Sequence, residues 1–399
     1  MQCLLTVNAG SSSIKFALFE MDTSLYRTMS GKIDRIGLPG TMLTVTDTTS
    51  RKIEQVPLDA SEHSECVAPL LNAIERRVGV SALTAVGHRV VHGGKRYREP
   101  QWITNDMLAT LRMISPLDPD HLPLELALIE AFAQRGAGLR QVACFDTAFH
   151  RTMPPVATLL PIPRHYAESG VQRYGFHGLS YAFLMEELER LAGPDAARGR
   201  VILAHLGNGA SLAAVHKGKS LDTTMGFTPT SGIPMGSRSG DVDPGCVTFL
   251  LKQERMTASQ FHEMVNTRSG LLGISETSSD VRDLLEREAS DPRAEEAIAL
   301  FCYQAKKAIG GFAAALGGLD TVVFSGGIGE NAAVVRARIC AGLEFLGIVL
   351  HDDRNRAHAP IITKDGSGVA VRVIRTDEEL QMAKTVARLL ACAPTALAQ

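Results

Sequence analysis

Two segments far apart in the sequence share one pattern: a strand of buried type, a bend of small polar residues and a second strand. The first consists of CLLTV at 3–7, the bend NAGSSS at 8–13 and the alternating IKFALFEM at 14–21. The second consists of VILAHL at 201–206, the bend GNGA at 207–210 and SLAAVHKGK at 211–219. The pattern indicates a weak internal repeat of strand–turn–strand units. Two unrelated hairpins would also fit, because Asn-Gly hairpins are common.

Helical and strand patterns alternate through the rest of the chain. Helical periodicity occurs at about 180–193, 276–288, 293–316, 330–345 and 377–391, and the strand TVVFS at 321–325 leads into GGIGEN and a helix. This alternation predicts an α/β fold, and 399 residues are typical of about two domains. The proline-containing segment 151–172 indicates a connection. We therefore predict a first domain at 1–149, to which a helix at 383–399 returns, and a second domain at 150–382.

Composition and charge exclude several classes of protein. The formal net charge is -2, whereas binding to a nucleic-acid backbone normally needs a basic excess. The seven scattered cysteines form no CxxC pair and no zinc spacing, which favours free thiols in a reducing cytosol. The N-terminus does not resemble a secretory signal, and no apolar run reaches the roughly 20 residues that span a bilayer. We expect a cytoplasmic protein without a nucleic-acid or membrane partner.

Three bends rich in small residues, at 8–13, 207–211 and 326–331, point to phosphate groups. A protein that holds ATP presents backbone N–H groups at close range, and glycine-rich turns and helix starts provide them. The chain contains neither a GxxxxGKS/T loop nor a GxGxxG motif opening an N-terminal βαβ unit. One such bend is usually only a turn. Three in one chain predict a nucleotide held between two domains.

Ionisable residues beside glycines and strand ends are the candidate groups for phosphoryl transfer. Arg89 lies in GHRVVHGG, Arg238 in PMGSRSGDVDPG and His177 in RYGFHGLSY. Cations of this kind stabilise the equatorial oxygens of a transferring phosphoryl group, and arginine binds two oxygens at once. Asp146 ends an apolar strand, where an acid needs a role or a partner, and Glu378 is a candidate magnesium ligand. Each has a plain alternative: a surface arginine, a satisfied core histidine or a helix N-terminal acid.

At these motifs the sequence resembles the acetate kinase family. The matching stretches, in family order, are VNAGSSSIKF (7–16), GHRVVHGG (87–94), FDTAFH (145–150), RYGFHG (173–178), HLGNGAS (205–211), MGFTP (225–229), SRSGDVDPG (237–245), SGLLGIS (269–275), SSDVRD (278–283), FSGGIGEN (324–331) and DEEL (377–380). The resemblance covers almost the whole chain. It implies the acetate and sugar kinase, Hsp70 and actin superfamily, with two duplicated ribonuclease-H-like α/β domains and a nucleotide and substrate cleft between them.

The resemblance also implies a role for each matching residue. Mg²⁺, with Mn²⁺ as an alternative, would be supported by Asn8 and Glu378. The catalytic residues would be Arg89, Asp146, His177 and Arg238, with Asp146 as the acid and His177 stabilising the transition state. The substrate pocket would consist of Arg89, Val91, Leu117, Phe176 and Pro229. The residues that bind ATP or ADP would be Ser11, Ser13, Lys15, His205, Leu206, Gly207, Asn208, Gly209, Asp280, Val281, Arg282, Gly327, Ile328, Gly329, Glu330 and Asn331.

The implied reaction is direct in-line phosphoryl transfer between ATP and acetate, giving ADP and acetyl phosphate, in a homodimeric enzyme. Propionate or another short-chain acid is an alternative acceptor, because one methylene in an apolar pocket discriminates by only about 1–3 kcal/mol. Val91 is the family's acetate-type residue and favours acetate. A remote alternative is a nucleotide-dependent switch protein of the same superfamily, which would not need the four catalytic residues together.

The chain departs from the family pattern near the expected substrate site. Asp118 follows the pocket leucine, where the family commonly has histidine. Leu179 and Tyr181 stand in the stretch that reads GTSH in the family, and Thr230 and Ser231 in the stretch that reads PLEG. These departures concern the carboxylate preference more than the reaction. Since an acid near an anion site is unfavourable unless paired, we expect Asp118 to point away from the substrate or to contact a cation.

Overall fold

The computed structural model describes residues 2–10, 13–79, 82–135 and 138–392. The chain forms two compact units, the first comprising Met1–Ala148 and Asp377–Gln399 and the second Phe149–Thr376. The returning segment of the first unit thus starts at Asp377, earlier than the 383–399 helix expected from the sequence. Residues 393–399 of that expectation lie outside the described residues.

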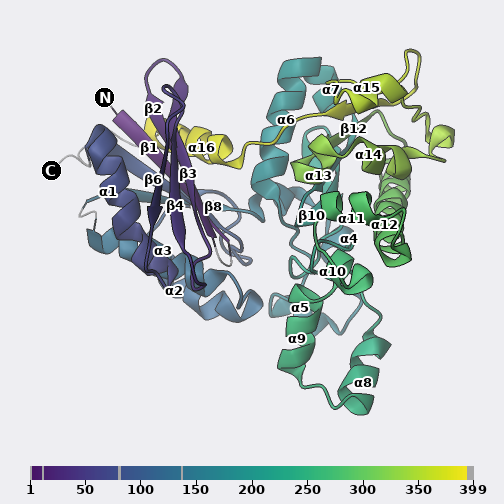
Figure 1. The fold of residues 1–399 in the computed structure, drawn as a ribbon, viewed down its shortest axis with the longest axis horizontal. Coiled ribbons are helices and arrows are strands. Elements are labelled where there is room, and N and C mark those ends of the chain that lie inside the picture. Colours follow the sequence, from purple (N-terminus) through teal and green to yellow (C-terminus); the bar gives the residue numbers. More distant parts are fainter. Residues whose placement is uncertain (1, 11–12, 80–81, 136–137, 393–399) are drawn as a thin grey trace. The chain divides into compact units, whose positions relative to one another are not determined.

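The first unit is built on an eight-stranded sheet in the order β5-β4-β3-β2-β1-β6-β8-β7. Its strands are β1 (Gln2–Ala9), β2 (Ser13–Met21), β3 (Leu25–Asp34), β4 (Met42–Asp47), β5 (Ile53–Pro57), β6 (Leu83–Val90), β7 (Gln101–Trp102) and β8 (Arg140–Phe145). Its α-helices are α1 (Val67–Val78), α2 (Asn105–Ile114), α3 (Leu122–Arg135) and α16 (Glu378–Cys392). Figure 1 shows α16, in yellow, beside the purple strands of this sheet.

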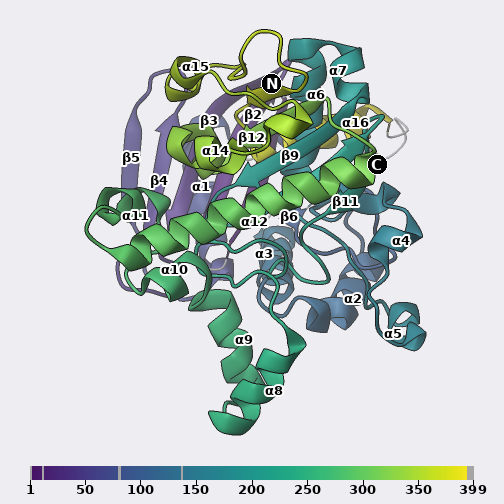
Figure 2. The same cartoon turned by 90° about the vertical axis from the view of Figure 1, so that its right-hand side faces the viewer.

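The second unit is built on a five-stranded sheet in the order β11-β10-β9-β12-β13. Its strands are β9 (Arg200–Leu206), β10 (Ala210–His216), β11 (Lys219–Thr223), β12 (Thr321–Ser325) and β13 (Ala370–Val373). Its α-helices are α4 (Pro155–Thr158), α5 (Arg164–Glu168), α6 (Gly178–Ala192), α7 (Pro194–Arg198), α8 (Pro244–Gln253), α9 (Ala258–Thr267), α10 (Gly270–Ser275), α11 (Val281–Arg287), α12 (Pro292–Leu316), α13 (Gly326–Asn331), α14 (Ala333–Cys340) and α15 (Asp352–Arg356). Figure 2 shows α12 running across this sheet, where it packs on β9 and β10.

The two sheets repeat one topology. In the first, β1 and β2 are antiparallel, as are β2 and β3, while β1, β6 and β8 are parallel neighbours. In the second, β9 and β10 are antiparallel, as are β10 and β11, while β9, β12 and β13 are parallel neighbours. Five strands therefore correspond in order and direction, and the bends 8–13 and 207–210 join corresponding strands. The predicted α/β class and its duplication are confirmed.

Capping residues and left-handed backbone positions set the helix ends, both for the helix that was predicted accurately and for the two that were not. The helix predicted at 293–316 is α12, which begins after the Asp291 cap and ends at Gly317, whose φ of 69° suits a residue without a Cβ. The continuous helix predicted at 276–288 is wrong, because Glu276 takes a left-handed φ of 55° and a new helix begins after the Asp280 cap. The helix predicted at 330–345 is likewise broken at Ala332 and ends at Cys340.

Alternation along the strands decides which side chains face the site. Cys3, Leu5 and Val7 of β1 belong to the core beneath α1 and α3, so Asn8 lies on the opposite face of the sheet. That opposite face carries α16, which packs against β1 and β6. In the part of the chain that the structure describes, no helix is long and apolar enough to cross a membrane.

Candidate active site

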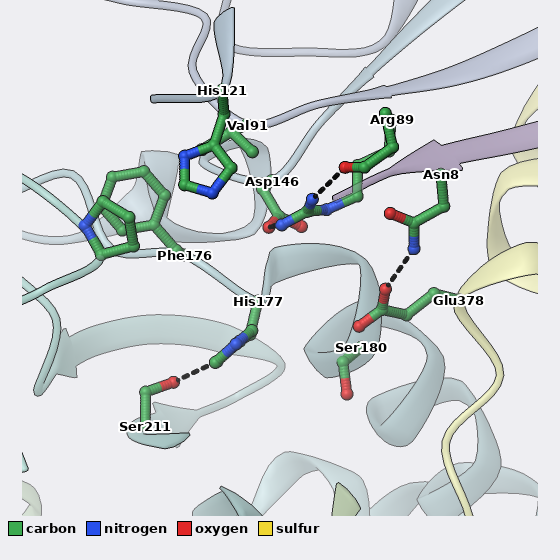
Figure 3. Close-up of polar contacts among 12 residues, drawn as sticks. Asn8, Arg89, Val91, His121, Asp146, Phe176, His177, Ser180, Ser211 and Glu378 are labelled. Atoms are coloured by element: carbon green, nitrogen blue, oxygen red, sulfur yellow. Dashed lines mark hydrogen bonds and ion pairs between the residues drawn. The ribbon is translucent and has the colours of Figure 1, made fainter. Parts of the chain in front are cut away.

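On the face that carries α16, the ends of three parallel strands place a buried ion pair. Arg89 lies near the end of β6, and Asp146 directly follows β8. The guanidinium donates to Asp146 Oδ2 through Nε at 3.2 Å and Nη2 at 2.7 Å, as Figure 3 shows. Asp146 is fully buried, and its Oδ1 has no hydrogen-bond partner among the described residues. A buried acceptor of that kind is costly, so it is available for a substrate or an ordered water.

A second pair lies next to the first. Asn8, at the end of β1, donates from Nδ2 to Glu378 Oε2 at 3.0 Å, and Glu378 is the first residue of α16. Asn8 pairs with Lys15 across the β1–β2 hairpin. We call Asn8, Arg89, Asp146 and Glu378 the first-unit cluster.

Burial dominates the electrostatics of the first-unit cluster. It raises the pKa of Glu378, with Asp146 adding to the effect and Arg89 and Lys15 opposing it. Burial also disfavours the charged form of Arg89, but the neighbouring carboxylates outweigh it, and the pKa of Arg89 is raised above its ordinary value. The guanidinium therefore stays charged beside these carboxylates.

The cluster has features that suit a divalent cation. Asn8 Oδ1 and the second carboxylate oxygen of Glu378 are oxygen donors, which magnesium prefers, and a cation there would offset the cost of burying Glu378. Among the described residues, no group of three or more His, Cys, Asp and Glu side chains could hold a metal by itself. The donor set thus fits an ion that keeps waters or phosphate oxygens as its other ligands.

A buried carboxylate that the sequence analysis did not single out holds the backbone of the predicted substrate pocket. Glu125 of α3 is buried and accepts from the Val91 amide through both oxygens, at 3.0 and 3.2 Å. Burial raises the pKa of Glu125 to about 8, against the opposing charge of Arg89. Val91 is itself fully buried. Its backbone and the position of the expected methyl contact therefore depend on Glu125.

Asp118 contacts a histidine of the same unit. Its Oδ1 accepts from His121 Nδ1 at 2.9 Å, whereas its buried Oδ2 has no partner among the described residues. Figure 3 draws His121 in the same close-up as Val91. Position 121 therefore supplies an imidazole in contact with Asp118, although the position where the family has histidine carries an acid. Leu117 is half-buried in the same turn.

In the second unit, His177 is held in an unusual backbone position. It caps α6 with a left-handed φ of 58°, which is uncommon for a residue with a side chain. Its Nδ1 lies 2.8 Å from Ser211 Oγ, and its ring stacks on His205 at 4.3 Å between centroids. His205 Nδ1 in turn lies 2.8 Å from Ser180 Oγ. The ring is fixed on its edge and on one face.

Three predicted residues converge at the tip of the β9–β10 hairpin. A Cβ added to Gly209 would lie 3.2 Å from His177 Nε2 and 3.7 Å from Arg238 Nη1. Arg238 also donates from Nη1 to the carbonyl oxygen of Pro229 at 3.3 Å. Two nitrogen groups therefore face one small space above a hairpin whose tip residue has no side chain. We call His177, Gly209 and Arg238 the second-unit cluster.

A pocket of about 560 Å³ lies wholly within the second unit and gathers three predicted segments. Its lining residues are Gly207, Asn208, Ser279, Asp280, Val281, Arg282, Leu285, Gly327, Ile328, Asn331 and Ala332. Of these, Ser279, Leu285 and Ala332 were missed from the sequence. Arg282 is tied back to Asp280 at 2.6 Å. Leu206, Gly329 and Glu330 were predicted to contact the nucleotide and are not among the lining residues.

Glu330 and Arg336 instead hold the loop that forms one wall of this pocket. Glu330 Oε1 accepts from the amides of Gly326 at 3.0 Å and Thr376 at 3.1 Å. Arg336, fully buried, donates from Nη1 to the carbonyl oxygens of Gly329 and Glu330 at 2.8 and 3.0 Å. Burial lowers the pKa of Arg336 to about 10. Gly326 has a φ of 75°, and a Cβ there would lie 2.6 Å from the Leu206 carbonyl oxygen, so only glycine fits.

The remaining predicted residues lie near these groups. Ser13 is half-buried and Lys15 exposed on β2, Phe176 is buried directly before His177, and Pro229 is half-buried. Ser11 lies outside the described residues.

Three features together define a class of protein, the α/β small-molecule kinases. They are the duplicated sheet with a glycine bend at a corresponding hairpin, the buried Arg–Asp pair, and the pocket beside a histidine–arginine cluster. The chain belongs to the acetokinase family, whose profile matches residues 3–384.

Relatives of known name cover nearly the whole chain. It is 44% identical over 391 residues to the acetate kinase of Rhodopseudomonas palustris (strain TIE-1), covering 97% of this chain and 98% of that protein. It is 40% identical to the propionate kinase of Citrobacter rodentium (strain ICC168), covering 97% and 96%. The crystal structure of Porphyromonas gingivalis acetate kinase matches with a TM-score of 0.89 at 38% identity, covering 98% of this chain and 100% of that one.

Proposed function

We propose that this protein catalyses the reversible transfer of the γ-phosphoryl group of ATP to acetate, giving ADP and acetyl phosphate. Family membership supports a kinase. The observation that carries the proposal is the pocket of the second unit, because it brings residues 207–208, 279–285 and 327–332 into one volume. A pocket of this size suits a nucleoside.

The walls of the pocket divide by chemistry. Val281, Leu285 and Ile328 offer apolar surface for a purine ring, while Gly207 and Asn208 lie at the hairpin tip. A hairpin tip of small residues lets phosphate oxygens approach backbone N–H groups. In this arrangement the γ-phosphoryl group would be directed from the pocket towards the second-unit cluster.

The first-unit cluster would bind the acceptor carboxylate. Arg89 is held by Asp146 through Nε and Nη2, which fixes the plane of its guanidinium fork. The remaining N–H groups can bind a carboxylate oxygen and orient it for attack, and fixed orientation of this kind supplies much of the rate acceleration. The acetate methyl group would pack on Val91.

His177 and Arg238 would stabilise the transition state. Charge spreads over the three equatorial oxygens as the phosphoryl group passes from ADP to acetate, and preorganised donors facing those oxygens lower the barrier. Nε2 of His177 and Nη1 of Arg238 face the same space above Gly209. Magnesium, or manganese, would be held by Glu378 and Asn8 and would supply neutralisation of the nucleotide's phosphate charge.

Propionate is the second candidate acceptor. The relatives include both acetate and propionate kinases at similar identity, and an apolar pocket discriminates weakly against one extra methylene. Buried Val91, whose amide is held by Glu125, leaves acetate favoured. We also propose a homodimer in the cytoplasm with only small-molecule substrates, and sedimentation velocity tests the first of these.

Initial rates with Mg-ATP against acetate, propionate and butyrate, with hydroxylamine trapping of the acyl phosphate, test the function. The expected result is the highest kcat/KM for acetate. A higher value for a longer acid would assign the pocket to another acyl kinase. Nucleotide binding by calorimetry without any acyl phosphate formation would refute the proposed reaction.

A further inference from the structure

A chain of two hydroxyl groups leads from the protein interior to the edge of His177. The Tyr181 hydroxyl lies 2.5 Å from Ser211 Oγ, and Ser211 Oγ lies 2.8 Å from His177 Nδ1. Tyr181 and Ser211 are both fully buried. The Tyr181 ring packs against both Phe149 and His150, at 5.7 and 5.6 Å between centroids. The phenol therefore has a fixed position relative to the histidine.

Alternation and helical spacing bring these groups together. Ser211 lies on the same face of β10 as Ala213 and Val215, which pack in the core cluster that includes Tyr181 of α6. Tyr181 follows His177 by one helical turn, so both side chains lie on one side of α6. The contact is built into a rigid sheet and helix of one unit rather than into a loop.

The hydrogen bonds of the hydroxyl chain can be donated in either of two directions. The two directions differ in whether Nε2 of the imidazole carries a proton. A serine hydroxyl has one proton to donate. If Tyr181 donates to Ser211, then Ser211 donates to Nδ1, and the proton of neutral His177 is on Nε2. If the chain is reversed, His177 donates from Nδ1 and Nε2 carries a bare lone pair. A phenol, whose pKa is about 10 in model peptides, is the stronger donor of the two hydroxyls, which favours the first direction.

Nε2 is the His177 atom that faces Gly209 and Arg238. It would lie 3.2 Å from a Cβ at Gly209, on the side where Arg238 also presents a donor. An N–H there stabilises phosphoryl oxygens, whereas a lone pair would repel them. The direction of the hydroxyl chain therefore decides whether neutral His177 helps or opposes transfer.

We propose that Tyr181 is a positioning residue which, through Ser211, holds neutral His177 as the tautomer with its proton on Nε2. Its consequence for turnover rests on the proposed function, but the tautomer does not. The residue stands at a position where the family pattern has histidine. The Tyr181 hydroxyl acts on His177 through Ser211, while the Tyr181 ring lies edge-on to the His177 ring at 6.4 Å between centroids.

The test is Tyr181→Phe, which keeps the buried ring and removes only the hydroxyl. Histidine ¹⁵N chemical shifts report the tautomer, with the His177 signal identified by its loss in His177→Gln. Wild type should show the proton on Nε2, and Tyr181→Phe should shift His177 towards Nδ1–H. In the hydroxylamine assay, kcat should fall about 10-fold, the loss expected for one hydrogen bond, while KM for ATP is unchanged. Tyr181→His, which restores a donor, should recover part of kcat.

Tyr174→Phe is the matched control. Tyr174 is buried in the same unit and donates its hydroxyl to the Gly170 carbonyl oxygen at 2.8 Å, so its loss should leave the His177 tautomer and kcat unchanged. Ser211→Ala provides a second interruption of the chain if the tyrosine variant does not fold. An Nε2–H tautomer that persists in both interrupted variants would overturn the proposal. A tautomer shift in a protein without acetate-dependent activity would instead support the positioning role and refute the proposed function.

Discussion

Gly209→Ala tests whether the second-unit cluster is the catalytic centre, because one methyl group would enter it. The new Cβ would lie 3.2 Å from His177 Nε2, 3.6 Å from Cε1 and 3.7 Å from Arg238 Nη1. Ordinary van der Waals contact begins at about 3.4 Å, so the ring must move by a few tenths of an ångström. It cannot move freely, since Ser211 holds its edge and His205 its face.

The size of the effect follows from that displacement. A misplacement of about 1 Å costs about 100-fold in rate, so a shift of about 0.3–0.5 Å should lower kcat about 4- to 10-fold. Folding should be little affected. Replacing glycine by alanine in a permitted conformation stabilises a protein by about 0.4–1 kcal/mol through the unfolded chain, which offsets the local crowding. We expect kcat to fall while Tm stays within a few degrees of wild type.

The assay is steady-state acyl phosphate formation, with differential scanning calorimetry on the same samples. Gly310→Ala is the control, because Gly310 lies within α12 and a Cβ there meets nothing within 4 Å. It should raise Tm slightly, by the helix propensity of alanine, and leave kcat unchanged. The reasoning fails if Gly209→Ala keeps full kcat, or if it loses activity only because it unfolds.

Three further variants test features of the two units. Arg336→Lys should lower the free energy of unfolding by about 2–4 kcal/mol in urea titrations and raise KM for ATP. The reason is that a single ammonium group cannot replace the guanidinium fork that holds the 329–330 carbonyls. An unchanged KM for ATP would show that Arg336 does not support nucleotide binding. Glu125→Gln should change the pH dependence of Tm. The pKa of Glu125 is raised from 4.5 to about 8 in the folded protein, so between those values the folded protein binds a proton that the unfolded chain does not. Wild-type stability therefore falls as pH rises between those values. The variant should lack that slope, and an unaltered slope would contradict the burial argument. His121→Gln should raise KM for acetate about 5- to 10-fold, the cost of one polar contact, with KM for ATP unchanged; equal changes in both would point to a folding defect.

Local patterns were enough to single out the candidate residues that lie on bends and strand ends. The small-residue bends, Arg89 and His177 could be singled out because glycines stand close to each of them in the sequence. The duplicated topology was visible as two similar hairpins. The α/β class also followed from alternation alone.

The supporting residues could not be predicted, for a physical reason. Arg336 and Arg338 stand two apart in the same short helix, yet Arg336 is buried against the 329–330 carbonyls and Arg338 pairs with Glu288 at 2.7 and 2.8 Å. Glu125 looks like an ordinary acid in the first turn of a helix. Burial of a charged side chain is decided by tertiary packing, and the sequence around it carries no periodic signal of it. The signal for Tyr181 was only that it departs from the family pattern.

The return of α16 to the first unit has a consequence for the order of events during synthesis. Residues 149–376 form one continuous unit, so the second unit can fold while the chain is still growing, as domains commonly do. The first unit begins earlier and finishes later. Its sheet face at β6, where a Cβ at Gly87 would lie 2.8 Å from Val386, stays uncovered until α16 leaves the ribosome. The same helix carries Glu378. The helix that covers this sheet face and the proposed metal ligand are therefore synthesised together, and a nascent chain cannot have one without the other.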